Sequence, residues 1–75
     1  MKKQIFPGII VDPKTKLGKP VIKGTRVPVA LVLAELANGM NVKELTKEYH
    51  LTQDQVFAAL RYAHATVSNE EIVTI

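Results

Sequence analysis

The sequence predicts a mainly α-helical fold, with a short N-terminal β-hairpin followed by a three-helix, homeodomain-like helix-turn-helix core. Short β-branched runs between turn residues occupy the first part of the chain, and apolar residues at helical spacing follow. Two capping boxes mark where the last two helices begin. A chain of 75 residues makes one domain at most. We divide it into a basic β-arm (1–26), a helical core (27–67) and a C-terminal tail (68–75).

The β-arm contains two candidate strands. Ile9–Val11 and Val21–Ile22 are both bounded by Gly, Pro or Asp, and residues 12–18 between them have the composition of a turn. Pro20 has no amide hydrogen to donate, so we place it at a strand start or at a sheet edge. Because an isolated hairpin is weak in water, this one needs the helical body or a second copy of the chain against it.

The first helix is expected over residues 28–38. Pro28 suits its first position, where the missing N–H costs nothing, and Gly39 suits the position just past its end. The segment is apolar almost all round, with Glu35 as its only charged residue. It is therefore either the central helix of the domain or a helix with one face at an interface.

Capping boxes open the other two helices. The box over residues 41–44 predicts a helix over 42–49, and the box over 52–55 predicts a helix that continues to about Val67. The short link at residues 50–51 joins them as a helix-turn-helix. We expect the aromatic side chains of these helices to lie in the core or at an interface: Tyr49, Phe57 and Tyr62.

Charge is distributed unevenly along the chain. Residues 1–26 hold seven basic residues and one acidic residue, a balance of +6, whereas residues 27–75 hold three basic and six acidic residues, a balance of −3. This asymmetry suggests an arm that faces a polyanion. The alternative is that the lysines keep the hairpin soluble and protect its edge.

The sequence lacks the residues that several classes of function require. There is no Cys, which fits a cytoplasmic protein, and His50 and His64 have no companions at metal-ligand spacing. No nucleophile–base pair, glycine-rich phosphate loop or paired carboxylates appear, so we expect neither an enzyme nor a cofactor. No segment is long and apolar enough to span a membrane.

The run from residue 18 to residue 29, GKPVIKGTRVPV, is the most specific motif of the chain. It resembles the signature of a prokaryotic family known as domain of unknown function four-three-three. Later segments that match the family pattern lie at residues 37–40, 48–52 and 56–63, so the resemblance covers about residues 9–65. His50 stands where many members of the family have Pro. The resemblance implies a homeodomain-like fold and an antitoxin role beside a PIN-like ribonuclease partner.

Three residues of the run are interpreted as a structural junction between the arm and the first helix. Gly24 allows a tight bend or a positive φ angle, and Pro28 starts the helix. Thr25 is expected to hydrogen-bond the first exposed N–H groups of that helix, since Val27, the nominal cap, has no suitable side chain.

Three cations of the same run remain after this structural interpretation: Lys19, Lys23 and Arg26. They are candidates for binding phosphate or an acidic site on a partner protein. For Arg26 a structural alternative stays open, in which it pairs with a carboxylate such as Glu35 or Glu48 or bonds free carbonyl groups.

The last helix occupies the position of a recognition helix. It offers Gln53, which can read adenine, and Arg61 further along, but Asp54 repels phosphate. A core helix that also builds a dimer or partner surface is therefore favoured over a base-reading helix. If DNA is bound, the basic arm is expected to supply most of the affinity.

The leading hypothesis is a small antitoxin-like protein that forms a homodimer and binds a protein partner, with binding of operator DNA as a further expectation. The dimer is expected because the chain is short and its first helix is apolar almost all round. Two alternatives remain, a stand-alone DNA-binding regulator and a structural interaction module that binds no nucleic acid.

Overall fold

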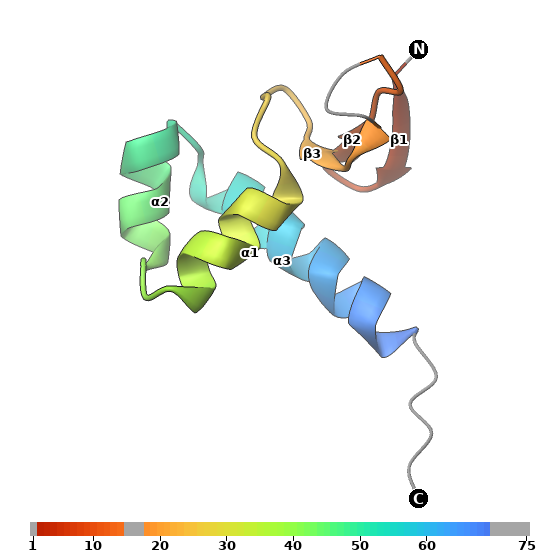
Figure 1. Ribbon diagram of the computed structural model, residues 1–75. Helices are drawn as coiled ribbons and strands as arrows, with labels where there is room; N and C mark the ends of the chain where they lie inside the picture. Colours follow the sequence, from red (N-terminus) through yellow and green to blue (C-terminus); the bar gives the residue numbers. More distant parts are fainter. Residues whose placement is uncertain (1, 15–17, 70–75) are drawn as a thin grey trace, which may run out of the picture.

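Three strands precede three helices in the computed structural model, which describes residues 2–14 and 18–69 (Figure 1). The elements are β1 (Lys3–Phe6), β2 (Ile9–Val11), β3 (Val21–Ile22), α1 (Val29–Ala37), α2 (Val42–Tyr49) and α3 (Gln53–Ser68). The fold is mainly helical with a small N-terminal antiparallel sheet, as predicted. The predicted tail beyond residue 69 lies outside the described residues.

The sheet has three strands in the order β1-β2-β3, one strand more than the predicted hairpin. Both pairings are antiparallel, and the β1–β2 register shifts between Gln4 and Phe6. Only Phe6 of the four residues of β1 is even half-buried. An outer strand with almost no buried face carries no alternation of apolar and polar residues, which is why the sequence did not reveal it.

After a tight turn at residues 23–25, the chain between β3 and α1 runs back beside β3 as far as Pro28. Val21 forms an isolated bridge with Pro28, and the Val29 amide donates to the Pro20 carbonyl at 3.1 Å. Pro28 has φ −67° and ψ 144°, so it is the N-cap residue and the helix begins at Val29. The prediction that Pro28 is the first helical residue was therefore wrong by one position, because its pairing with β3 holds it in the extended region.

The predicted ends of α2 and α3 are confirmed. Asn41 accepts from the Glu44 amide at 2.8 Å while the Glu44 side chain accepts from the Asn41 amide at 2.9 Å. Thr52 and Gln55 exchange the same pair of bonds at 3.1 and 2.8 Å. Between the helices, His50 adopts the left-handed conformation with φ 56°, which ends α2 and turns the chain into α3.

Sheet and helices share one core. The largest fully buried side chains come from β2, β3 and all three helices: Ile9, Ile22, Val32, Leu45 and Val56. The ring of Phe6 packs edge-on against Tyr62 of α3, with 5.6 Å between ring centroids. Burial against the helices therefore stabilises a sheet that is too small to persist alone.

Helix α1 crosses α3, with α2 to one side (Figure 1), and its exposed positions are alanines: Ala30, Ala34 and Ala37. Among the described residues, the exposed large apolar side chains are Ile5 on β1 and Val67 on α3. No described helix combines the length and the apolar character that crossing a membrane requires.

Candidate binding surface at the β3–α1 turn and helix α3

A tight turn follows β3 and carries two of the candidate cations. The Thr25 amide donates to the Ile22 carbonyl at 3.1 Å, and Gly24 at the third position has φ +81°, as in a type II turn. The Lys23 amide donates to the Gly8 carbonyl at 2.8 Å, which ties the turn to the loop between β1 and β2. We call residues Lys23–Arg26 the basic turn. The positive φ predicted for Gly24 is confirmed.

The hydroxyl of Thr25 holds this turn and does not cap α1. It donates to the Ile22 carbonyl at 2.8 Å and accepts from the Val27 amide at 3.0 Å. Helix α1 has no side-chain cap, so the predicted capping role of Thr25 was wrong. The reason is geometric, because the extended residues Val27 and Pro28 separate Thr25 from the first helical turn, and the Val29 amide already donates to Pro20.

The side chains of Lys23 and Arg26 are exposed, and within residues 2–14 and 18–69 neither forms an ion pair. The proposed pairing of Arg26 with Glu35 or Glu48 is therefore not present there. The amides of Gly24 and Arg26 also have no acceptor in that part of the chain. A Cβ built on Gly24 would meet nothing within 4 Å, so the tip of the basic turn faces open space.

Glu35 has a different partner, on α2. The Tyr49 hydroxyl donates to a Glu35 carboxylate oxygen at 2.5 Å and links α1 to α2. This hydrogen bond raises the pKa of Tyr49 above 10.0, and burial together with the negative charges of Glu35 and Glu48 acts in the same direction. Tyr49 thus packs partly against the core, as predicted, and it also joins two helices.

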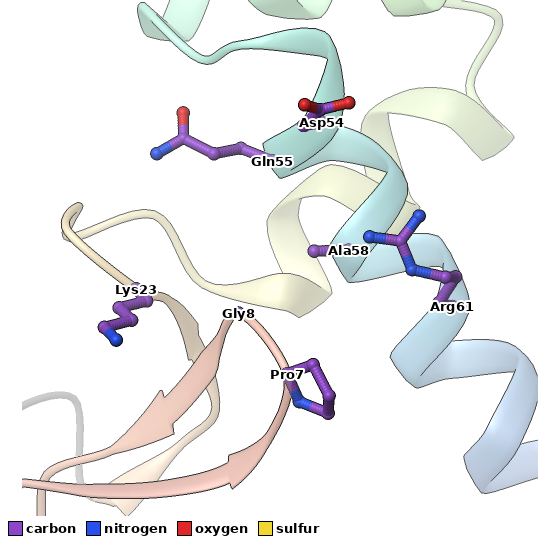
Figure 2. A pocket seen from close by; sticks show the side chains of 7 residues that line it. All are labelled: Pro7, Gly8, Lys23, Asp54, Gln55, Ala58 and Arg61. Carbon is purple, nitrogen blue, oxygen red and sulfur yellow. The ribbon is translucent and has the colours of Figure 1, made fainter.

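An open hollow of about 350 Å³ lies where the sheet meets α3 (Figure 2). It is lined by Pro7, Gly8, Lys23, Asp54, Gln55, Ala58 and Arg61. Figure 2 shows Lys23 and Arg61 on opposite sides, with Gly8 and Ala58 between them. The fold therefore places two candidate cations at the edges of one hollow, one from the basic turn and one from α3, although the ammonium group of Lys23 points away from Arg61.

Two small residues form the base of this hollow. Gly8 has φ +82°, and a Cβ built on it would lie 3.0 Å from the Cβ of Ala58. Any side chain at position 8 would press into α3 and fill the space. Sequence reasoning used Gly8 only as a strand boundary, and nothing local indicated that it meets Ala58, 50 positions away in the printed sequence.

Gln55 and Asp54 give the hollow its remaining polar groups. The Gln55 side-chain oxygen accepts from the Thr52 amide, which leaves its NH₂ group without an acceptor among the described residues. Asp54 is exposed in the first turn of α3. In the described part of the chain, no three His, Cys, Asp or Glu residues are grouped so that they could hold a metal ion.

The other candidate residues lie apart. Lys19 is exposed ahead of β3, and Arg26 is exposed on the basic turn and does not line the hollow. Gln53 lines a second hollow of about 410 Å³ with Val42, Lys43 and Thr46. Of the five predicted binding residues, the fold brings only Lys23 and Arg61 to one hollow.

The sequence model of a family described as "Protein of unknown function (DUF433)" matches residues 9–63, which is most of the chain. The chain belongs to the DUF433 family. This membership confirms the resemblance that the run at residues 18–29 predicted. The matched range contains the basic turn and Arg61, whereas β1 and the Pro7-Gly8 turn precede it.

The DUF433 chain is also similar to a solved structure, the X-ray crystal structure of Rv2018 from Mycobacterium tuberculosis. The two share 36% sequence identity with a TM-score of 0.62 over 69% of this chain. The similar region is only 24% of Rv2018, so this chain spans about a quarter of that protein. No curated protein matches the sequence.

Proposed function

We propose that this DUF433 chain is an antitoxin-like module that binds a protein partner and that also binds double-stranded DNA through the basic turn. The observation that carries the DNA role is the basic turn itself. Its cations are exposed and have no ion-pair partner among the described residues, while the hydrogen bonds of Thr25 and the bond from the Lys23 amide to the Gly8 carbonyl fix its backbone. In a structural interaction module, these cations would instead be expected to form ion pairs within the folded protein.

The chemistry of the basic turn suits phosphate. Lys and Arg side chains and free backbone amides are the groups that contact phosphate oxygens of DNA. The amides of Gly24 and Arg26 supply such donors beside two cations. Because Asp54 repels phosphate at the start of α3, most of the affinity is expected from the basic turn, and base reading from Gln53 is a minor contribution.

Fluorescence anisotropy with a duplex from the region upstream of the gene tests the DNA role. Arg26→Ala and Lys23→Ala are each expected to weaken binding and to reduce the slope of log affinity against log salt by about one. Lys14→Ala is the matched control, since Lys14 is an equally charged exposed residue at the opposite end of the sheet. Equal losses in all three variants, or equal binding to an unrelated duplex, would contradict a site at the basic turn.

The hollow beside α3 favours a second role, the binding of a protein partner. It combines an apolar base with two cations that lack ion-pair partners among the described residues. By family resemblance we propose a PIN-like ribonuclease as the partner, which makes the chain the antitoxin of a two-gene pair. Co-expression with the product of the neighbouring gene is the test. Copurification together with rescue of growth supports this role, and the absence of both outcomes rejects it.

A further inference from the structure

We infer that the hollow between the sheet and α3 is a docking site for a single acidic side chain, flanked by apolar residues, on a partner protein. The inference extends the partner-binding half of the proposed function and assigns it a site. It differs from the DNA role because it involves Arg61, Gln55 and Ala58 and leaves out Arg26.

The polar lining of the hollow is rich in donors. Arg61 presents a planar guanidinium that can bind a carboxylate through two parallel hydrogen bonds, and Lys23 adds a second cation. The free NH₂ group of Gln55 is a third donor. Among the described residues these groups have no acceptor, so a carboxylate from outside would satisfy them.

The base of the hollow is apolar and shaped for a side chain. Pro7 and Ala58 line it, and Gly8 leaves space that any other residue would fill. Its volume of about 350 Å³ falls at the small end of the range typical of ligand pockets. Apolar neighbours of the docked carboxylate would cover Pro7 and Ala58, and the water they displace would favour binding.

The negative charge of Asp54 bears on whether the hollow binds a carboxylate of a protein or the backbone of DNA. Its carboxylate lines the same hollow on α3, one helical turn before Ala58 (Figure 2). A duplex brings closely spaced phosphates along its whole length, and some of them would lie near Asp54. A peptide brings one carboxylate that can bind Arg61, while Lys23, whose ammonium group points away from Arg61 in Figure 2, adds positive charge at the edge of the hollow; the charge pattern therefore favours the peptide.

Titration followed by amide NMR of the full chain tests the site. The probe is a capped pentapeptide with a central Glu between two Leu, and the matched probe has Gln in place of that Glu. The Glu peptide is expected to shift the amide signals of Gly8, Gln55 and Ala58, and the Gln peptide to bind about tenfold more weakly. Arg61→Gln should produce a similar loss, while Lys47→Gln, an exposed change on α2, should have no effect.

Three results would overturn the inference. In the first, the Glu peptide leaves the three signals unshifted. In the second, the Glu and Gln peptides bind equally well. In the third, binding of the Glu peptide is unchanged in both Arg61→Gln and Lys23→Gln. Shifts of the same signals by a DNA duplex but not by the peptide would make the hollow a phosphate site. Unchanged spectra of each free variant away from its substituted residue establish that the variant is folded. Loss of DNA binding in Arg26→Ala with intact peptide binding separates this site from the DNA role.

Discussion

Thr25 shows how one side chain can determine the geometry of a turn. Its hydroxyl is a donor to Ile22 and an acceptor from Val27, and its amide also bonds to Ile22. These contacts fix the backbone of the basic turn, on which Lys23 and Arg26 stand exposed. The sequence correctly identified Thr25 as a junction residue, but the partners of its hydroxyl depended on where the chain leaves the sheet.

Thr25→Val removes the hydroxyl group and leaves the shape of the side chain nearly unchanged. The Val27 amide would lose its acceptor in a half-buried position, so we expect a loss of about 1–2 kcal/mol in the free energy of unfolding. Urea denaturation measures it. Thr66→Val is the control, because Thr66 bonds only to the Tyr62 carbonyl on the exposed part of α3. Losses of equal size in both variants would argue against a special role for Thr25.

Gly8 and Gly24 both have a positive φ angle, but they differ in what surrounds them. A Cβ on Gly24 meets nothing within 4 Å, whereas one on Gly8 approaches Ala58 at 3.0 Å. Gly24→Ala should therefore cost about 1–2 kcal/mol from the left-handed backbone alone. Gly8→Ala should cost clearly more, because α3 or the sheet has to move as well. Equal costs in thermal unfolding would mean that the sheet does not pack closely on α3.

At the scale of elements, the helix ends were predictable and the sheet was not. The capping boxes of α2 and α3 consist of residues three positions apart, so their hydrogen bonds are encoded locally. Strand β1 is defined by its pairing with β2 and by the contact of Phe6 with Tyr62. Its own residues are mostly exposed, and no pattern within Lys3–Phe6 marks a strand.

The hydrogen bond between Tyr49 and Glu35 makes the packing of α1 on α2 sensitive to high pH. The pKa of Tyr49 is raised above 10.0 in the folded chain, so the neutral phenol is favoured by folding. Its contribution to stability is complete below about pH 10 and is lost as the pH rises through the raised pKa. Tyr49→Phe should lower the midpoint of thermal unfolding at neutral pH. At higher pH the midpoints of the variant and of the natural chain should lie closer together. A constant difference across the range would contradict this coupling.

At the scale of the whole molecule, one core joins the sheet to the three helices, and the proposed binding surface lies where the sheet meets α3. Lys23 reaches the hollow from the turn after β3, and Arg61 reaches it from α3. The hydrogen bond from the Lys23 amide to the Gly8 carbonyl joins the basic turn to the loop between β1 and β2. A change that loosens the sheet would therefore disturb the hollow without touching either cation.

The homodimer remains a prediction. The exposed residues of α1 are alanines, so a dimer face there would be small and closely packed, while Ile5 and Val67 are 42% and 59% exposed elsewhere. Sedimentation equilibrium at micromolar concentration should show a dimer. Ile5→Lys and Ala34→Lys then distinguish an interface at β1 from one at α1, since a charge disrupts only the face it occupies. A stable monomer throughout this concentration range would reject the dimer.

The sequence by itself determined the helical core, the ends of α2 and α3, the left-handed bend at Gly24 and membership of the DUF433 family. Each of these depends on residues close together in the chain or on the matching run. Only the tertiary structure decided that Pro28 stays extended, that β1 completes the sheet, and that Lys23 and Arg61 border one hollow. These features arise from pairing and packing between distant segments, which local hydrogen bonds and periodicity do not encode.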